Sequence, residues 1–294
     1  MKPDRALTWA VLAALTLIWG TTWAAIRVSL EGIPPIAGVA LRFGIAAAAL
    51  FAVVPVLGVR LGRSRTERRL WLANTLLTFA APYGVLYWAE QWVPSGLAAV
   101  LFATHPLIVA LAAHFVLPDD QLTRRKLLGI LIGFAGVAVI FSEDFRALGG
   151  SRVATAAAVL LVSPFCAALA NVAVKRWGEG IHPISISAVP MGLTALLMGA
   201  LSWLVEADRE FAFGTAPVLA LLYLAIIGSA LPFTLYFWLL KHQTATALSL
   251  INYATPVIAV ALGTLFLDEP FTLRILIGAA LVLVGVGVAV RRKV

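Results

Sequence analysis

The chain has 294 residues, of which 62% are hydrophobic and only 12% are charged. Soluble domains carry about 25% charged residues, so the composition excludes a soluble fold and indicates a membrane protein. The net charge of +8 comes from short basic clusters between apolar stretches, which suits loops beside a lipid bilayer and argues against nucleic acid as a partner. The single cysteine excludes an internal disulfide bond.

Apolar stretches long enough to cross a bilayer follow one another along the whole chain. A helix needs roughly 20 apolar residues to span the hydrocarbon core. We predict ten transmembrane helices, at residues 7–28, 34–58, 70–92, 95–117, 124–141, 153–175, 183–205, 216–240, 244–267 and 272–290. Lys2 and Arg5 before the first stretch are typical of a signal peptide. That stretch is long and recurs later in the chain, so we predict a retained span instead.

The basic residues predict the orientation of the chain. Alternate connections, together with both ends of the chain, hold most of the lysines and arginines, and the stretch from Arg60 to Arg69 is the richest. Because basic loops stay on the cytoplasmic side, we predict that both termini are cytoplasmic. The short connections favour a multi-pass protein of a bacterial cytoplasmic (inner) membrane.

The two halves of the chain repeat each other. Three pairs of segments match: "LEGIPPI" at 30–36 with "GEGIHPI" at 178–184, "APYGVLYWAEQ" at 81–91 with "LPFTLYFWLLK" at 231–241, and Pro106 followed by Asp119–Asp120 with Pro256 followed by Asp268–Glu269. Each half then holds five spans, and an odd number forces the second copy to lie upside down in the membrane. We therefore predict two inverted five-helix repeats, residues 1–148 and 149–294, with a substrate site between them near the midplane.

Three long segments carry a resemblance to a known family. They are "IWGTTWAAIRVSLEGIPPIAGVALRFGIAAAAL" (18–50), "YWAEQWVPSGLAAVLFATHPLIVALAAHFVL" (87–117) and "LPFTLYFWLLKHQTATALSLINYATPVIAVALGTLFLDEP" (231–270). The chain resembles the drug/metabolite transporter (DMT) superfamily in its EamA-type ten-helix branch. The resemblance implies an all-α polytopic membrane fold, shaped like a basket with a central cavity, that exports or exchanges small metabolites. It does not fix the substrate, because such proteins move amino acids, sugars, nucleotides and cations.

Two charged residues stand out within the spans. Arg42 lies about eight residues into the second span, roughly 12 Å from its outer end. A charge at that depth costs about 2.5–3.5 kcal/mol or more on insertion scales unless it finds a partner or water. Glu90, at the outer end of the third span, is the candidate partner, and the second half lacks both charges at the matching Pro190 and Leu240. We hypothesise that Arg42 and Glu90 form an outer ion pair or gate; the alternative is a structural arginine bound to backbone carbonyls.

Aromatic side chains in three spans are candidates for a cavity wall. Tyr83 and Tyr87 recur at helical spacing on one face of the third span, and Phe233 matches Tyr83 in the repeat. Trp19 lies deep in the first span, away from the interface where tryptophan is enriched. We predict that these rings stack on an apolar or aromatic substrate; packing between helices is the alternative interpretation.

Three polar side chains inside apolar runs are candidates for substrate contacts. His105 precedes Pro106, and this proline is expected to kink the fourth span and free a backbone carbonyl. Histidine can also exchange a proton near neutral pH. Asn171 and Asn252 lie within the sixth and ninth spans. All three could instead be structural, as hydrogen bonds between helices.

No enzyme motif can be assembled from the sequence. There is no phosphate-binding loop of the Walker type and no metal-ligand spacing such as HExxH. We therefore expect no cofactor, no metal and no enzymatic activity, and a gradient as the driving force. The predicted function is a secondary transporter of small metabolites, with apolar or aromatic amino acids as the preferred substrates, working by alternating access. An exporter of organic cations or drugs, and a non-transporting scaffold or sensor, remain as alternatives, and the choice between monomer and homodimer stays open.

Overall fold

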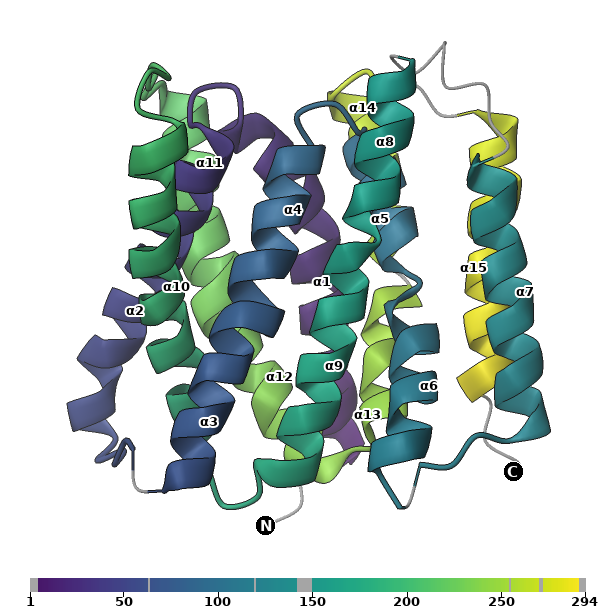
Figure 1. Cartoon of the computed structure of the whole chain (residues 1–294), viewed down its shortest axis with the longest axis horizontal. Helices are drawn as coiled ribbons and strands as arrows, with labels where there is room; N and C mark the ends of the chain where they lie inside the picture. Colours follow the sequence, from purple (N-terminus) through teal and green to yellow (C-terminus); the bar gives the residue numbers. More distant parts are fainter. Residues whose placement is uncertain are drawn as a thin grey trace.

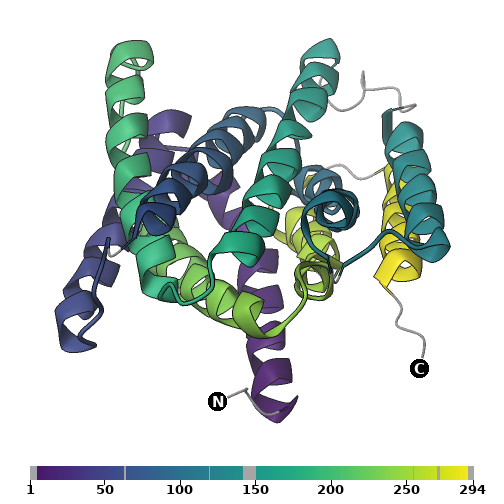
Figure 2. The ribbon, with the colours of Figure 1, turned by 60° about the horizontal axis from the view of Figure 1, so that its bottom comes forward.

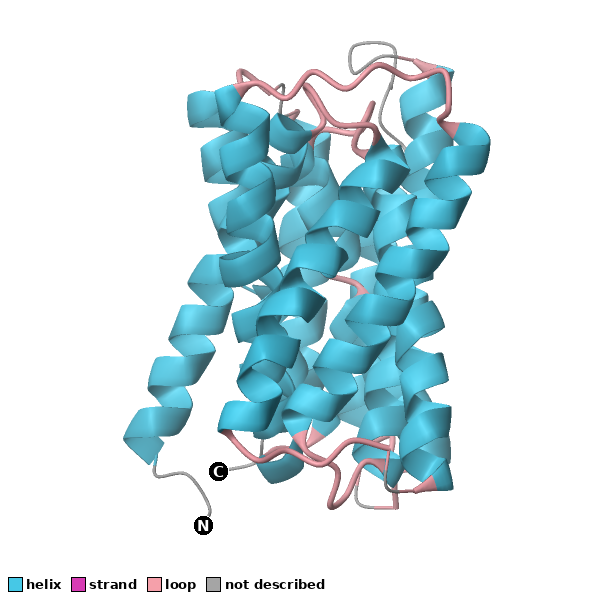
Figure 3. Cartoon of the chain, turned by 90° about the vertical axis from the view of Figure 1, so that its left-hand side faces the viewer, coloured by secondary structure: helices cyan, strands magenta, loops and turns pink. Residues whose placement is uncertain are grey.

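A computed structural model of the chain describes residues 5–62, 64–118, 120–141, 150–253, 255–269 and 272–290. Regular structure in these ranges is helical throughout, and loops join the helices at both ends of the bundle (Figure 3). The elements are α1 (Arg5–Ser29), α2 (Pro35–Val56), α3 (Arg65–Asn74), η1 (Thr75–Ala80), α4 (Ala81–Ala89), α5 (Ser95–Phe102), α6 (His105–Val116), α7 (Arg124–Phe141), α8 (Ser151–Leu160), α9 (Val162–Trp177), α10 (Pro183–Val205), α11 (Thr215–Ala225), η3 (Ile226–Ala230), α12 (Leu231–His242), α13 (Ala245–Leu248), η4 (Ser249–Tyr253), α14 (Thr255–Phe266) and α15 (Leu273–Val290).

Helices that continue one another combine into long segments that run between the two ends of the bundle (Figure 1). Joining α3 to α4, α5 to α6, α8 to α9, α11 to α12 and α13 to α14 gives ten segments in the described residues, at nearly the predicted positions. Within the described residues, six helical stretches are long and apolar enough to cross a membrane, and shorter apolar helices accompany them. The prediction of an all-α polytopic membrane fold is therefore confirmed.

In the view of Figure 1, α1 begins at the lower end of the bundle and finishes at the upper end. The segment α8–α9 is the first segment of the second half of the chain, as α1 is the first segment of the first half. It runs from the upper end of the bundle to the lower end, opposite to α1 (Figure 1). α2 and α10 pack together, as do α7 and α15, which form a pair at one edge of the molecule (Figures 1 and 2). Each of these pairs joins corresponding spans of the two halves.

Glycine permits the close approach of α7 to α15. A Cβ atom on Gly136 would lie 2.6 Å from the carbonyl oxygen of Gly278, and a Cβ atom on Gly285 would lie 2.4 Å from the backbone nitrogen of Gly133. No side chain fits at such distances, so the small residues let the two backbones touch. Glycines at this spacing therefore hold two helices of the same chain together.

Prolines interrupt the segments that surround the centre of the bundle. Pro82 and Pro232 each follow a π-helical turn, η1 and η3 respectively. Proline has no N–H for the i→i−4 bond, and the wider turn accommodates its ring. The segment α5–α6 breaks just before His105 and Pro106. These breaks bring polar side chains and backbone carbonyls to mid-depth.

Candidate functional site

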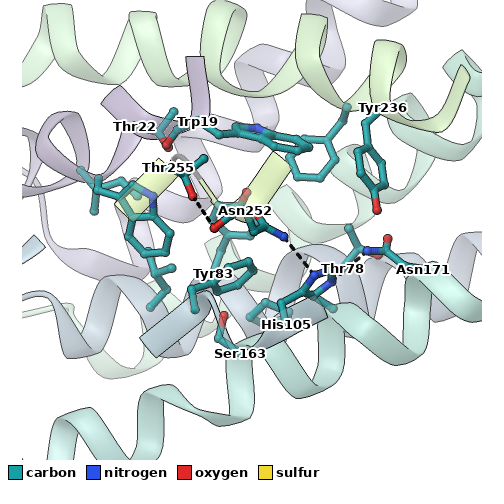
Figure 4. Close-up of a pocket in the computed structure, with 17 residues that line it drawn as sticks. Trp19, Thr22, Thr78, Tyr83, His105, Ser163, Asn171, Tyr236, Asn252 and Thr255 are labelled. Atoms are coloured by element: carbon teal, nitrogen blue, oxygen red, sulfur yellow. Dashed lines mark hydrogen bonds between the residues drawn. The ribbon is translucent and has the colours of Figure 1, made fainter. Parts of the chain in front are cut away.

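A cavity lies at the centre of the bundle, where both halves of the chain meet (Figure 4). Side chains from α1, η1, α4, α5 and α6 form one part of its wall, and side chains from α9, α12, η4 and α14 form the other. Its volume is about 80 Å³. A water molecule needs at least about 10–15 Å³ by the same measure, so there is room for roughly half a dozen. A metabolite would need the walls to move apart.

His105 lies between two asparagines at this cavity (Figure 4). Its Nε2 atom is 3.0 Å from Nδ2 of Asn171, and its Nδ1 atom is 3.0 Å from Nδ2 of Asn252. The ring also stacks on Phe102, with centroids 5.6 Å apart and planes inclined by 8°. His105 belongs to the first half of the chain and both asparagines to the second, so the three side chains form a polar bridge between the halves.

The chemistry of this bridge restricts how its amides are oriented. A neutral imidazole offers one N–H donor and one acceptor nitrogen, whereas an amide NH₂ group only donates. The ring is also hydrogen-bonded to the backbone of Ala167, so its N–H has an acceptor there, and its acceptor nitrogen can take a hydrogen bond from one asparagine NH₂ group. Asn171 is also hydrogen-bonded to Tyr236. A continuous chain of neutral polar groups thus runs from α12 through α9 and α6 to η4.

Aromatic rings complete the wall. Trp19 lies 5.4 Å, centroid to centroid, from both Phe233 and Tyr236, and Tyr83 lies 6.3 Å from Phe233. Six of the seven predicted cavity residues line the cavity: Trp19, Tyr83, His105, Asn171, Phe233 and Asn252. Their part in substrate binding stays a prediction. Tyr87 does not line the cavity in this conformation, because it is fully buried behind the wall, where Arg42 Nη1 donates to its hydroxyl at 3.4 Å; its part in substrate binding stays a prediction too.

Two buried polar atoms at the cavity have no hydrogen-bond partner in the described part of the chain. They are Nε1 of Trp19 and Oγ of Ser163. Sequence reasoning missed Ser163, although a signal was present. Ser163 precedes Pro164 as His105 precedes Pro106, and Thr255, which also lines the cavity, precedes Pro256 in the same way. A polar residue directly before a proline in an apolar run marks each of these positions.

Arg42 is fully buried, and its guanidinium group binds neutral groups only. Nε donates to Ser229 Oγ at 2.7 Å, and Nη2 donates to the carbonyl oxygen of Gly228 at 3.1 Å. Pro232 has no N–H, so the carbonyl of Gly228, four residues earlier, lacks its α-helical donor and is open to the arginine. The guanidinium carbon also lies 4.7 Å from the ring centroid of Tyr83, directly behind the cavity wall.

The predicted ion pair between Arg42 and Glu90 is not formed in this conformation. The donors of Arg42 reach Ser229, Gly228 and Tyr87, and neither carboxylate oxygen of Glu90 has a partner among the described residues. The arginine binds the carbonyl oxygen of Gly228, in the π-helical turn before Pro232, and does not bind the carboxylate of Glu90. The arginine therefore follows the structural alternative here, and a gating role for the pair stays a prediction.

Formal charge is lacking in the cavity wall as far as the structure describes it. The described lining residues include no aspartate, glutamate, lysine or arginine. No cluster of three or more histidine, cysteine or acidic side chains suited to a metal ion is found among the described residues. Hydrogen bonds from neutral groups and stacking on aromatic rings are the interactions that this site can offer a small molecule.

The chain is similar to a family of transporters, to individual proteins of known sequence and to a solved structure. The profile described as "EamA-like transporter family" matches residues 5–142 and again residues 154–291. The chain is 31% identical over 265 residues to the uncharacterized inner membrane transporter YedA of Escherichia coli (strain K12), covering 86% of the chain and 80% of YedA. It is 28% identical over 275 residues to the uncharacterized transporter YoaV of Bacillus subtilis, covering 94% of each. A protein crystal structure superposes with a TM-score of 0.73 over 98% of this chain and 97% of that one, at 22% identity.

Proposed function

The chain belongs to the EamA-like transporter family, and from this premise we propose that it exports or exchanges small metabolites across a bacterial inner membrane by alternating access. The family relation makes it a multi-pass membrane transporter. The inner-membrane location follows the printed name of YedA, and the basic connections favour cytoplasmic termini.

The arrangement of the two halves supports alternating access. The family profile matches each half separately, corresponding spans run in opposite directions, and the cavity lies where the halves meet. Residues 1–148 and 149–294 are then two inverted repeats. Two such repeats can exchange conformations, so that a state open at the upper end has a counterpart open at the lower end. The small cavity of this conformation corresponds to an intermediate between them.

Apolar and aromatic amino acids are the substrates that we propose. The observation that carries this choice is an aromatic wall around the bridge of His105, Asn171 and Asn252. Trp19 Nε1, a donor without a partner, suits a carboxylate oxygen, and the buried charge of Arg42 behind Tyr83 favours the same group. The amide oxygen of an asparagine can accept from the ammonium group. Organic cations fit less well, because the described wall holds no carboxylate.

Counterflow into proteoliposomes tests the proposal. Vesicles preloaded with unlabelled phenylalanine, leucine or other amino acids should accumulate the labelled compound from outside. Asn171→Ala should lower the initial rate roughly 10-fold to 100-fold, because leaving buried polar partners unpaired costs about 1–3 kcal/mol. An equal rate in Asn171→Ala, or counterflow of organic cations but of no amino acid, would contradict the proposed substrate.

A matched pair of variants on α14 controls for non-specific damage. Thr255 lines the cavity and is buried, whereas Thr264 on the same helix is exposed. Both threonines can be changed to alanine with the same loss of volume. Thr255→Ala should reduce counterflow, and Thr264→Ala should leave it at the level of the unmodified protein. Equal effects would show that the cavity has no special part in transport.

A further inference from the structure

Glu90 differs from the other buried acids of the described chain. Four carboxylate side chains are buried there: Glu67, Glu90, Asp120 and Glu206. Three of them accept hydrogen bonds. Glu90 is 0% exposed, and both of its carboxylate oxygens are buried without a partner. An acceptor group left in this state needs a physical explanation.

The nearby cations do not bind the carboxylate. Arg27 Nη1 donates to the backbone oxygen of Glu90, and Arg42 donates to groups of α4 and η3. The titratable groups that act on Glu90 electrostatically are Arg27 of α1, Arg42 of α2, Tyr87 of α4, and Glu269, which lies beyond α14. Glu269 is itself occupied by hydrogen bonds to Ser95 and Gly96.

Burial without a partner favours a neutral group at Glu90. Moving an ionised carboxylate into a dry, apolar site without hydrogen bonds costs far more than moving a protonated one, which loses only the hydrogen bonds of a neutral polar group. We propose that Glu90 is a proton-binding site, neutral while the upper end of the bundle is closed, that exchanges its proton with the aqueous side at that end. The ligand of the site is a proton.

The exchange is a balanced proton transfer. When the upper end opens, water reaches the carboxyl group, its O–H bond breaks, and the proton passes to a water molecule while the carboxylate remains beside Arg27. Closing reverses the step and takes up one proton from the same side. Acid on the upper side therefore favours the closed upper end. This consequence rests on the alternating access proposed above, whereas protonation of the closed form does not.

Infrared difference spectroscopy of the full chain in lipid vesicles tests the protonation directly. An ordinary glutamic acid titrates near pH 4.3 and is ionised at pH 7. We expect the carbonyl stretch of a protonated carboxyl group at pH 7, shifted in heavy water and absent from Glu90→Gln. Glu31→Gln, which changes an exposed acid at the same end, should keep the band. Absence of the band at pH 7, or its survival in Glu90→Gln, would overturn the proposal in favour of an ionised Glu90 balanced by Arg27 and Arg42.

Thermal unfolding gives an independent measurement. A native state that holds one proton more than the unfolded state loses stability as the pH rises. The melting temperature of the unmodified protein should therefore fall between pH 6 and pH 8 relative to that of Glu90→Leu, which carries the residue of the matching position, Leu240. Parallel curves would refute the proposal. Neither measurement needs a substrate, so a wrong substrate class would leave both results unchanged.

Discussion

At each end of the bundle, carboxylates of one half of the chain bind the other half. The second half supplies these carboxylates at the upper end, and the first half supplies them at the lower end. At the upper end, Glu206 and Glu269 of the second half bind the first turns of α2 and α5 in the first half. At the lower end, Glu67 and Asp120 of the first half bind Ser185 in α10 and Thr246 in α13, in the second half. Each half thus reaches across to hold the helix starts of the other.

The two ends differ in what the carboxylates hold. Glu269 accepts from the backbone amides of Ser95 and Gly96 at 2.8 and 3.2 Å, and from the Ser95 hydroxyl at 2.8 Å. Asp120, its counterpart in the repeat, accepts from the Thr246 hydroxyl at 2.6 Å, but the amide of that residue is 3.4 Å away. Anions at helix N-termini gain from the aligned amides. The upper contact is therefore the stronger one.

The lower end also contains a second cavity. This cavity, of about 410 Å³, lies between α9, α10 and α12, and Lys175 and Lys241 are among the residues that line it. It is larger than the central cavity. The weaker carboxylate contact and the larger cavity occur at the same end, so this conformation should open downward more easily than upward.

Glu269→Ala should have the largest effect on this balance. A hydrogen bond to a charged group contributes about 1.5–3 kcal/mol, which corresponds to roughly 10-fold to 100-fold in the ratio of the two conformations. We expect the upper-open state to gain by that factor. A cysteine at Thr22 in a Cys166→Ser background, labelled with an impermeant thiol reagent from the upper side, reports it. Glu31→Ala, an exposed acid at the same end, is the control, and equal labelling of the two variants would contradict the prediction.

Asp120→Asn should act in the opposite direction and more weakly. The asparagine keeps one acceptor oxygen for Thr246 but loses the charge that also binds Lys126 Nζ at 2.6 Å. Reagent added from the lower side should label the cysteine roughly 3-fold to 10-fold faster. Lys126→Gln removes the ion pair and leaves the contact with Thr246, so its effect should be smaller. Faster labelling from the upper side would reverse the assignment of the two ends.

The repeat in the sequence predicted that Asp120 and Glu269 correspond, but not what they bind. Hydrophobic length is a local property, so the spans at 124–141 and 183–205 could be read to within a residue. Asp120 and Thr246, by contrast, are 126 residues apart, and only the packing of the halves brings them together. The central polar residues were predictable because histidine and asparagine are rare in apolar runs.

Arg42 shows why other parts of the site could not be predicted. Its depth in the span was correct, but its partners come from a π-helical turn in the other half of the chain. The carbonyl of Gly228 is free to accept from Arg42 because Pro232 has no N–H. The residues around Arg42 carry no pattern that predicts this partner. The position of Tyr87 has the same origin, because in this conformation its side chain lies against this arginine and does not line the cavity.

Gly263→Ala should give a smaller version of the Glu269 effect. A Cβ atom at this position would lie 2.4 Å from Oε2 of Glu269, so the carboxylate must move away from α5. The glutamate side chain is flexible, and we expect labelling from the upper side to rise only a few-fold. Gly44→Ala is the control, since its Cβ atom would meet only Ala195 at an ordinary 3.5 Å. A similar change in both variants would point to a general effect of alanine on the helices.

His105→Ala should leave the balance between the ends unchanged while it lowers transport. The histidine joins the halves at mid-depth, through Asn171 and Asn252, and opening at either end need not break these bonds. Its loss removes the histidine partner of Asn252 and one of the two partners of Asn171, at about 1–3 kcal/mol for each lost hydrogen bond, which should lower counterflow at least about 10-fold. Labelling at Thr22→Cys from the two sides should keep its ratio. A shift of that ratio toward either side would mean that the polar bridge belongs to the gate at that end rather than to the substrate site that both ends share.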